Sequence, residues 1–121
     1  MKFQDNEHEQ RYINLLNKMK KHDCYHRSAA YLMALADLVP NDVFDFEKSC
    51  IKHHGVYKGW QTTSSLMATR LMFNLWNGWA YDEEVPENRE PSVAYAVDNL
   101  FYNHEYAPYF YEAIRIRFEW I

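Results

Sequence analysis

Histidine and cysteine side chains occur in two groups whose spacing could suit a metal ion: His22, Cys24 and His26, and then Cys50, His53 and His54. Zinc takes thiolate and imidazole ligands, four of them in a closed structural site. One set that satisfies this rule takes two residues from each group: Cys24, His26, Cys50 and His54. Neither group has a zinc-finger spacing such as Cys-x-x-Cys, and loose matches of this kind are mostly false. We therefore favour buried thiols with boundary histidines, and we expect no metal and no cofactor.

The dipeptide His22-Asp23 is also found in metal-dependent phosphohydrolases of the HD type. That chemistry needs a further histidine upstream and an aspartate far downstream. His8 and Asp98 could fill these places, although nothing in the spacing demands it. Asp23 is more simply interpreted as a helix cap. A metal- or ligand-dependent hydrolase of helical, HD-like type is the alternative function.

Four hydroxyl side chains at residues 62–65 precede an apolar helical pattern. Free amides at a helix start can hold a phosphate, and Lys58 and Arg70 lie on either side. A phosphate cradle normally adds a glycine-rich loop with an embedded lysine, which is missing after Gly59. We interpret the hydroxyls as a helix cap. The sequence also contains no Gly-x-Ser-x-Gly elbow, so we predict no catalytic residues.

An acidic segment at residues 82–91 is the main candidate for binding. It has five acids and two prolines in ten residues, a composition that cannot form a core element. Tyr95 and other aromatic residues lie near it, and aromatic anchors with steering charge suit a protein interface. The candidate binding residues are Trp60, Trp79, Tyr81, Glu83, Glu84, Glu87 and Glu90. A plain solvated loop is the other interpretation.

Four further polar residues lie on or beside apolar helical faces: His8, Arg11, Arg70 and Asn74. Polar groups in such places must be paired when they are buried. The structural interpretation is a network of His8, Arg11 and Asn74 between the first and the central helix. The functional interpretation is a small-molecule pocket lined by all four residues.

Hydrophobic periodicity predicts an all-α fold of about five helices. The first is capped by Asp5 or Asn6 and carries an apolar face at i, i+3, i+4 and i+7: Tyr12, Leu15, Leu16 and Met19. The second spans about 25–39, is apolar all round over 29–36, and should be buried. Pro40 is expected to stop it.

The rest of the chain predicts the remaining helices. For residues 45–55 we favour a short helix capped by Asp45, with a brief extended piece around Phe44 as the alternative. Residues 63–77 should form the central helix of the core, and Asn77-Gly78 suits its end. Ser92 is expected to cap a helix that runs to about residue 102. The last helix starts near Pro108 and presents one apolar side: Phe110, Ile114, Phe118 and Ile121.

Length and composition restrict the class of protein. The 121 residues allow a single helical domain, 1–121, with no spare length for a second. The net charge of −4 makes general nucleic-acid binding unfavourable. No apolar run approaches the roughly 18 residues that span a bilayer, the start lacks a signal peptide, and two cysteines need no disulfide scaffold. We therefore expect a cytoplasmic protein without a membrane partner. Its ten tyrosines and four tryptophans also make a homodimer credible.

Short motifs across nearly the whole chain resemble those of one family: Phe3-x-Asp5-x-x-His8-x-x-Arg11-Tyr12, Asp45-Phe46-Glu47, Gly59-Trp60-Gln61-Thr62, Arg70-Leu71-x-Phe73-Asn74-Leu75-x-Asn77-Gly78 and Ala113-Ile114-Arg115-Ile116-Arg117-Phe118. The family consists of small uncharacterised proteins, a domain of unknown function, from Gram-positive bacteria and their phages or mobile elements. The resemblance implies no known activity and no catalytic residues. It implies an accessory role, including inhibition of a host defence system. We predict a non-catalytic protein-interaction module whose partner is a protein of unknown identity.

Overall fold

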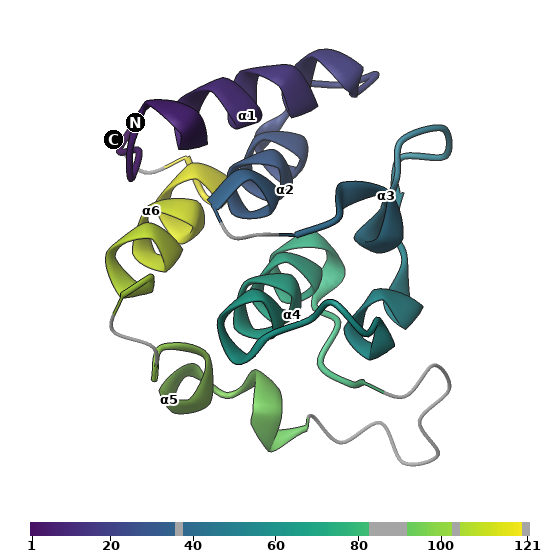
Figure 1. Ribbon diagram of the computed structural model, residues 1–121, viewed down its shortest axis with the longest axis vertical. Helices are drawn as coiled ribbons and strands as arrows, with labels where there is room; N and C mark the ends of the chain where they lie inside the picture. Colours follow the sequence, from purple (N-terminus) through teal and green to yellow (C-terminus); the bar gives the residue numbers. More distant parts are fainter. Residues whose placement is uncertain (36–37, 83–91, 103–104, 120–121) are drawn as a thin grey trace.

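The structure, a computed structural model, describes residues 1–35, 38–82, 92–102 and 105–119. These residues are mostly helical, with one two-stranded ribbon (Figure 1), which confirms the predicted all-α class. Six α-helices are present in the described ranges, where about five were expected. The elements are α1 (Asn6–Lys18), α2 (Cys24–Leu35), α3 (Pro40–Val43), β1 (Phe44–Asp45), β2 (Cys50–Ile51), the 3-10 helix η1 (His53–Tyr57), α4 (Thr63–Asn77), the 3-10 helix η2 (Val93–Tyr95), α5 (Val97–Leu100) and α6 (Ala107–Arg117).

Helix α2 is at the centre of the fold and packs against α1, α4 and α6. Nine of its twelve residues are buried. Small side chains at Ser28, Ala29, Ala30 and Ala34 let three neighbouring helices approach its backbone. The predicted burial of the apolar run is confirmed as far as Leu35. The central helix of the core is therefore α2, and the expectation that residues 63–77 take that place is wrong.

The first helix begins where the sequence predicts. The Asp5 side chain caps α1, and its Oδ1 accepts a hydrogen bond of 2.8 Å from the His8 amide. Tyr12, Leu15 and Met19 from the predicted apolar face are buried against the core.

Residues 40–51 differ from the prediction. Pro40 starts the four-residue helix α3, and β1 then pairs antiparallel with β2, so that Phe44 lies opposite Ile51. The Asp45 carboxylate accepts hydrogen bonds from the amides of Glu47 and Lys48 and so closes the turn between the strands. Side-chain bonds of this kind compete with helix formation. The favoured helix over 45–55 is therefore wrong, and the extended alternative around Phe44 is confirmed.

Helix α4 has the predicted ends. Thr62 and Ser65 form a reciprocal capping box at its start, and Gly78 ends it in the left-handed conformation with a φ of 76°. The Ser65 amide donates to Thr62 Oγ1 at 3.1 Å, and the Thr62 amide donates to Ser65 Oγ at 2.7 Å. These hydroxyls therefore act as a helix cap.

The segment after residue 91 is two short pieces in place of one helix over 92–102. Ser92 caps η2 as predicted, because its Oγ accepts from the Ala94 amide. Ala96 then adopts an extended conformation, with φ −68° and ψ 148°, and α5 starts after it. The chain therefore bends between Tyr95 and Val97.

Helix α6 buries a different face from the one expected. Phe110 is buried as predicted, but Ala113, Ile116 and Glu112 complete the buried side, while Phe118 is 51% exposed. Ile121 lies outside the described residues. None of the described helices is long and apolar enough to cross a membrane.

Replacing Gly55 with alanine is expected to destabilise the fold. The added Cβ would lie 2.6 Å from Val43 Cγ1 and 2.8 Å from the Asp42 carbonyl oxygen, and overpacking of this kind costs about 1–3 kcal/mol. Gly59→Ala is the matched control, because no described atom beyond its chain neighbours lies within 4 Å of that Cβ. Urea unfolding of both variants measures the difference. Equal stabilities would contradict the close packing at Gly55.

Candidate functional site

His8 and Arg11 bind the C-terminal end of α2. His8 is fully buried, and its Nε2 lies 3.0 Å from the Tyr31 carbonyl oxygen. Its Nδ1 accepts from the Gln4 amide at 3.0 Å, so the proton is on Nε2, which donates to Tyr31. Arg11 Nε donates to the Ala34 carbonyl at 2.8 Å. Both side chains therefore satisfy backbone acceptors of the central helix.

Arg70 and Asn74 bind the segment that follows α4. Arg70 makes a bidentate ion pair with Asp82 at 3.2 and 2.7 Å, and Asn74 Nδ2 donates to the Trp79 carbonyl at 3.2 Å. The predicted network of His8, Arg11 and Asn74 is therefore wrong. Each side chain pairs with a nearer partner, and the four residues form two separate sets.

The candidate metal ligands have other roles. The part of the chain that the structure describes contains no group of three or more His, Cys, Asp or Glu side chains that could hold a metal ion. The proposed set of Cys24, His26, Cys50 and His54 is therefore not assembled. His26 Nδ1 lies 2.7 Å from Asp23 Oδ1, which also accepts from the His26 amide. Burial disfavours the charged form of Asp23 and by itself would raise its pKa. The hydrogen bonds from His26 stabilise the carboxylate more strongly, so the pKa of Asp23 is lowered.

The HD-type set is not assembled either. His8 binds α2 at Tyr31, whereas Asp23 precedes the first residue of the same helix. Tyr31 lies eight positions after Asp23, a rise of about 12 Å along the helix. Asp98 lies exposed on α5. These side chains cannot converge on one metal ion in this structure.

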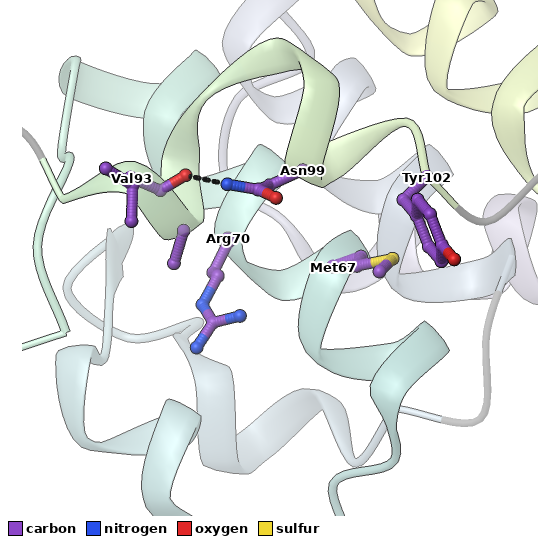
Figure 2. A pocket seen from close by; sticks show the side chains of 6 residues that line it. Met67, Arg70, Val93, Asn99 and Tyr102 are labelled. Atoms are coloured by element: carbon purple, nitrogen blue, oxygen red, sulfur yellow. Dashed lines mark hydrogen bonds between the residues drawn. The ribbon is translucent and has the colours of Figure 1, made fainter.

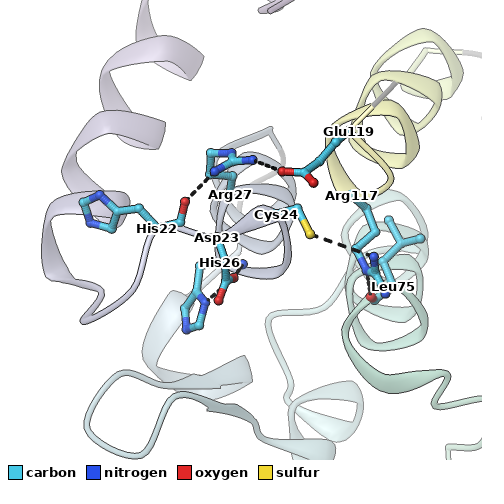
Figure 3. A network of polar contacts seen from close by, with 8 residues as sticks. All are labelled: His22, Asp23, Cys24, His26, Arg27, Leu75, Arg117 and Glu119. Carbon is cyan, nitrogen blue, oxygen red and sulfur yellow. Dashed lines mark hydrogen bonds and ion pairs between the residues drawn. The ribbon is translucent and has the colours of Figure 1, made fainter. Parts of the chain in front are cut away.

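A polar cluster near the start of α2 joins it to α4 and α6 (Figure 3). Arg117 Nε donates to the Leu75 carbonyl at 2.7 Å, and Nη1 lies 4.0 Å from Cys24 Sγ. The guanidinium carbon is 3.8 Å from the centre of the Tyr25 ring. These contacts hold three helices together.

The aromatic candidates are held by neighbours within the fold. Trp60 Nε1 donates to Asp42 Oδ2 at 2.8 Å. The Trp79 ring lies 3.7 Å from the His53 ring, centre to centre, and meets Tyr81 edge-on. The acidic candidates Glu83, Glu84, Glu87 and Glu90 lie outside the described residues.

Two pockets lie side by side between α4 and the η2–α5 segment. The first has a volume of about 440 Å³ and is lined by Met67, Arg70, Val93, Ala94, Asn99 and Tyr102 (Figure 2). The second has a volume of about 380 Å³ and is lined by Asn74, Gly78, Ala80, Ser92, Val93, Tyr95 and Ala96. Val93 lines both. Arg70 and Asn74, which the sequence marked as pocket residues, thus line neighbouring pockets on α4.

Two exposed apolar side chains, Val93 and Tyr102, line the first pocket, and a third, Val97, lies at the start of α5. Val93, Val97 and Tyr102 are 77%, 72% and 76% exposed. They face outward because Tyr95 and Leu100 take the inward positions of η2 and α5. Sequence reasoning placed this segment in one helix and did not identify the face. The composition of residues 93–102 could have indicated it, because their apolar side chains point to more sides than one core can bury.

The charge at the pockets is slightly negative. Residues 62–82 and 92–102 contain one cation, Arg70, and two anions, Asp82 and Asp98. Asp82 neutralises the guanidinium, whose carbon lies 6.0 Å from the centre of the Tyr95 ring. The Tyr95 hydroxyl donates to the Tyr81 carbonyl at 2.9 Å, and burial raises the pKa of this phenol. We call the surface formed by Met67, Val93, Val97 and Tyr102 the apolar face.

The fold and the pockets define a small, mostly helical protein with an exposed apolar face. The family of unknown function DUF6075 matches residues 1–120, and the chain belongs to this family. The predicted resemblance to an uncharacterised family is thereby confirmed. A search of curated proteins and a search of solved structures found no match.

The pKa of His8 is expected to lie below its usual value of 6.5, because burial disfavours the charged imidazole. Protonation at Nδ1 would also place a proton against the Gln4 amide. The unfolded chain therefore takes up a proton near pH 6.5 while the folded chain does not. The contribution of neutral His8 to the free energy of unfolding is therefore fully present above this pH. Below it, the free energy of unfolding falls by up to about 1.4 kcal/mol per pH unit.

Urea unfolding at pH 7.5 and 5.5 measures this loss, and His8→Gln, which keeps a donor for Tyr31, should reduce it. An NMR titration of the folded protein gives the His8 midpoint directly. A midpoint at or above 6.5, or the same loss of stability in His8→Gln, would contradict the assigned tautomer.

Proposed function

We propose that this protein is a non-catalytic protein-interaction module, a phage or mobile-element accessory factor of Gram-positive bacteria. It acts in the cytoplasm by binding and modulating, for example inhibiting, a host or defence protein. The observation that supports this proposal is the apolar face, where Val93 and Tyr102 are more than three-quarters exposed beside one pocket.

Single exposed apolar residues are ordinary, but apolar residues grouped around a pocket are typical of interaction sites. Polar residues at Val93, Val97 and Tyr102 would cost the fold little stability, because these exposed side chains contribute little to the core. Interfaces are rich in tyrosine and methionine, and Tyr102 and Met67 provide both at the first pocket.

The acidic segment supports a basic partner. Its described ends lie at the second pocket, where the Ser92 amide donates to the Ala80 carbonyl at 2.8 Å. The sequence between Asp82 and Ser92 contains four glutamates and one arginine. Such negative charge increases the association rate of a positively charged partner.

Affinity capture from the lysate of a Gram-positive host tests the proposal. We expect a protein retained by the native chain to be held at least about tenfold more weakly by Val93→Asp, the effect of losing one buried interface contact. Ile13→Asp is the matched control, because Ile13 is an exposed apolar residue on α1. Retention that both variants reduce equally, or repeated failure to retain any specific protein, would count against the proposal.

Elemental analysis of the purified protein tests the hydrolase alternative. The proposal expects no stoichiometric metal, whereas zinc or manganese at one ion per chain would favour metal-dependent chemistry and contradict a purely non-catalytic role.

A further inference from the structure

The two pockets share Val93 and follow α4, and we call them together the groove. Residues 67, 70, 74 and 78 are spaced by three or four positions, so they lie on one face of that helix. Met67 and Arg70 line the first pocket, and Asn74 and Gly78 line the second. The opposite wall is η2 with the start of α5, and Val93 lies between the two hollows. The eleven residue steps from Met67 to Gly78 give the groove a length of about 16 Å.

We propose that this groove binds one peptide segment of the partner protein, with an apolar side chain in each pocket and basic residues on either side. The inference rests on the proposed function and specifies the chemistry of the partner. A length of about 16 Å is covered by about five residues of extended peptide or by three turns of helix.

Apolar and small side chains determine what fits the pockets. Met67, Val93 and Ala94 form the apolar wall of the first. The second is open because Gly78, Ala80 and Ala96 leave room that larger side chains would fill. Each volume is within the range of pockets that enclose organic groups. Each pocket can therefore bury one large apolar side chain of a partner.

Arg70 selects a neutral acceptor at the first pocket. Its Nε and Nη2 are bound to Asp82, and among the described residues Nη1 has no acceptor (Figure 2 shows Arg70 between Val93 and Met67). Since Asp82 balances the charge, the remaining donor suits a main-chain carbonyl better than a phosphate. A peptide supplies such a carbonyl next to each side chain.

The charge around the groove favours a peptide with basic residues on either side of its apolar anchors. Asp98 is exposed on α5, and the residues of 62–82 and 92–102 together have a net charge of −1. No lysine or histidine lies in these ranges to repel a cationic peptide. A segment with apolar anchors and flanking Lys or Arg residues is thus complementary to the groove in shape, polarity and sign of charge.

Selection from a random library of dodecapeptides on the immobilised, full-length protein tests the inference. We expect enrichment of sequences with two large apolar residues and nearby Lys or Arg. Fluorescence anisotropy with the enriched peptides should show binding at least tenfold weaker to Val93→Asp, and severalfold weaker at low salt to Asp98→Lys. Binding to Ile13→Asp should be unchanged. Circular dichroism confirms that each variant is folded.

Several outcomes would overturn the inference: no enrichment, enrichment of acidic or wholly polar peptides, or binding that Val93→Asp does not weaken. A homodimer seen by light scattering and dissolved by Val93→Asp would assign the groove to a second copy and also overturn it. These results differ from failure of the proposed function. A partner captured from lysate in a Val93-dependent manner would maintain the interaction role even if the peptide class were wrong.

Discussion

The burial of α2 is the constraint on which the other elements depend. Three helices cover it, so the carbonyl groups near its C-terminal end cannot all be hydrated, and unpaired buried carbonyls are costly. His8 and Arg11 supply donors to Tyr31 and Ala34 from the neighbouring helix. This requirement fixes the register of α1 against α2. The Asp5 cap then fixes where α1 begins, since it binds the His8 amide.

The η2–α5 segment is held by fewer contacts than the helices around α2. Tyr95 and Leu100 are the buried residues of η2 and α5, and the pairing of Arg70 with Asp82 holds the end of the preceding segment against α4. Each of these contacts faces inward. Val93, Val97 and Tyr102 face solvent, and the space beside α4 stays open as the groove. The small number of inward contacts in this region is thus also the reason that a binding surface remains exposed.

The sequence predicted those elements whose caps and apolar patterns lie within a few consecutive residues. The Thr62 cap and Gly78 define both ends of α4, and the apolar run of α2 reports its burial. The ribbon was missed because the bonds of the Asp45 side chain to its own turn override a short helical pattern. The partners of His8 and Asn74 depend on how helices dock, which periodicity does not encode. The groove was missed because apolar composition does not tell which residues of 93–102 face outward.

The modest anchoring of η2 and α5 has a consequence for hydrogen exchange. Segments with few buried contacts open in local fluctuations that require much less free energy than global unfolding. We expect Tyr95 and Leu100 to leave the core while α1, α2 and α6 remain packed. Amide protons of the η2–α5 segment should then exchange by sub-global opening, and those of α2 only when the whole protein unfolds. Anything bound along α4 would be coupled to this local equilibrium, because one wall of its site belongs to this weakly anchored segment.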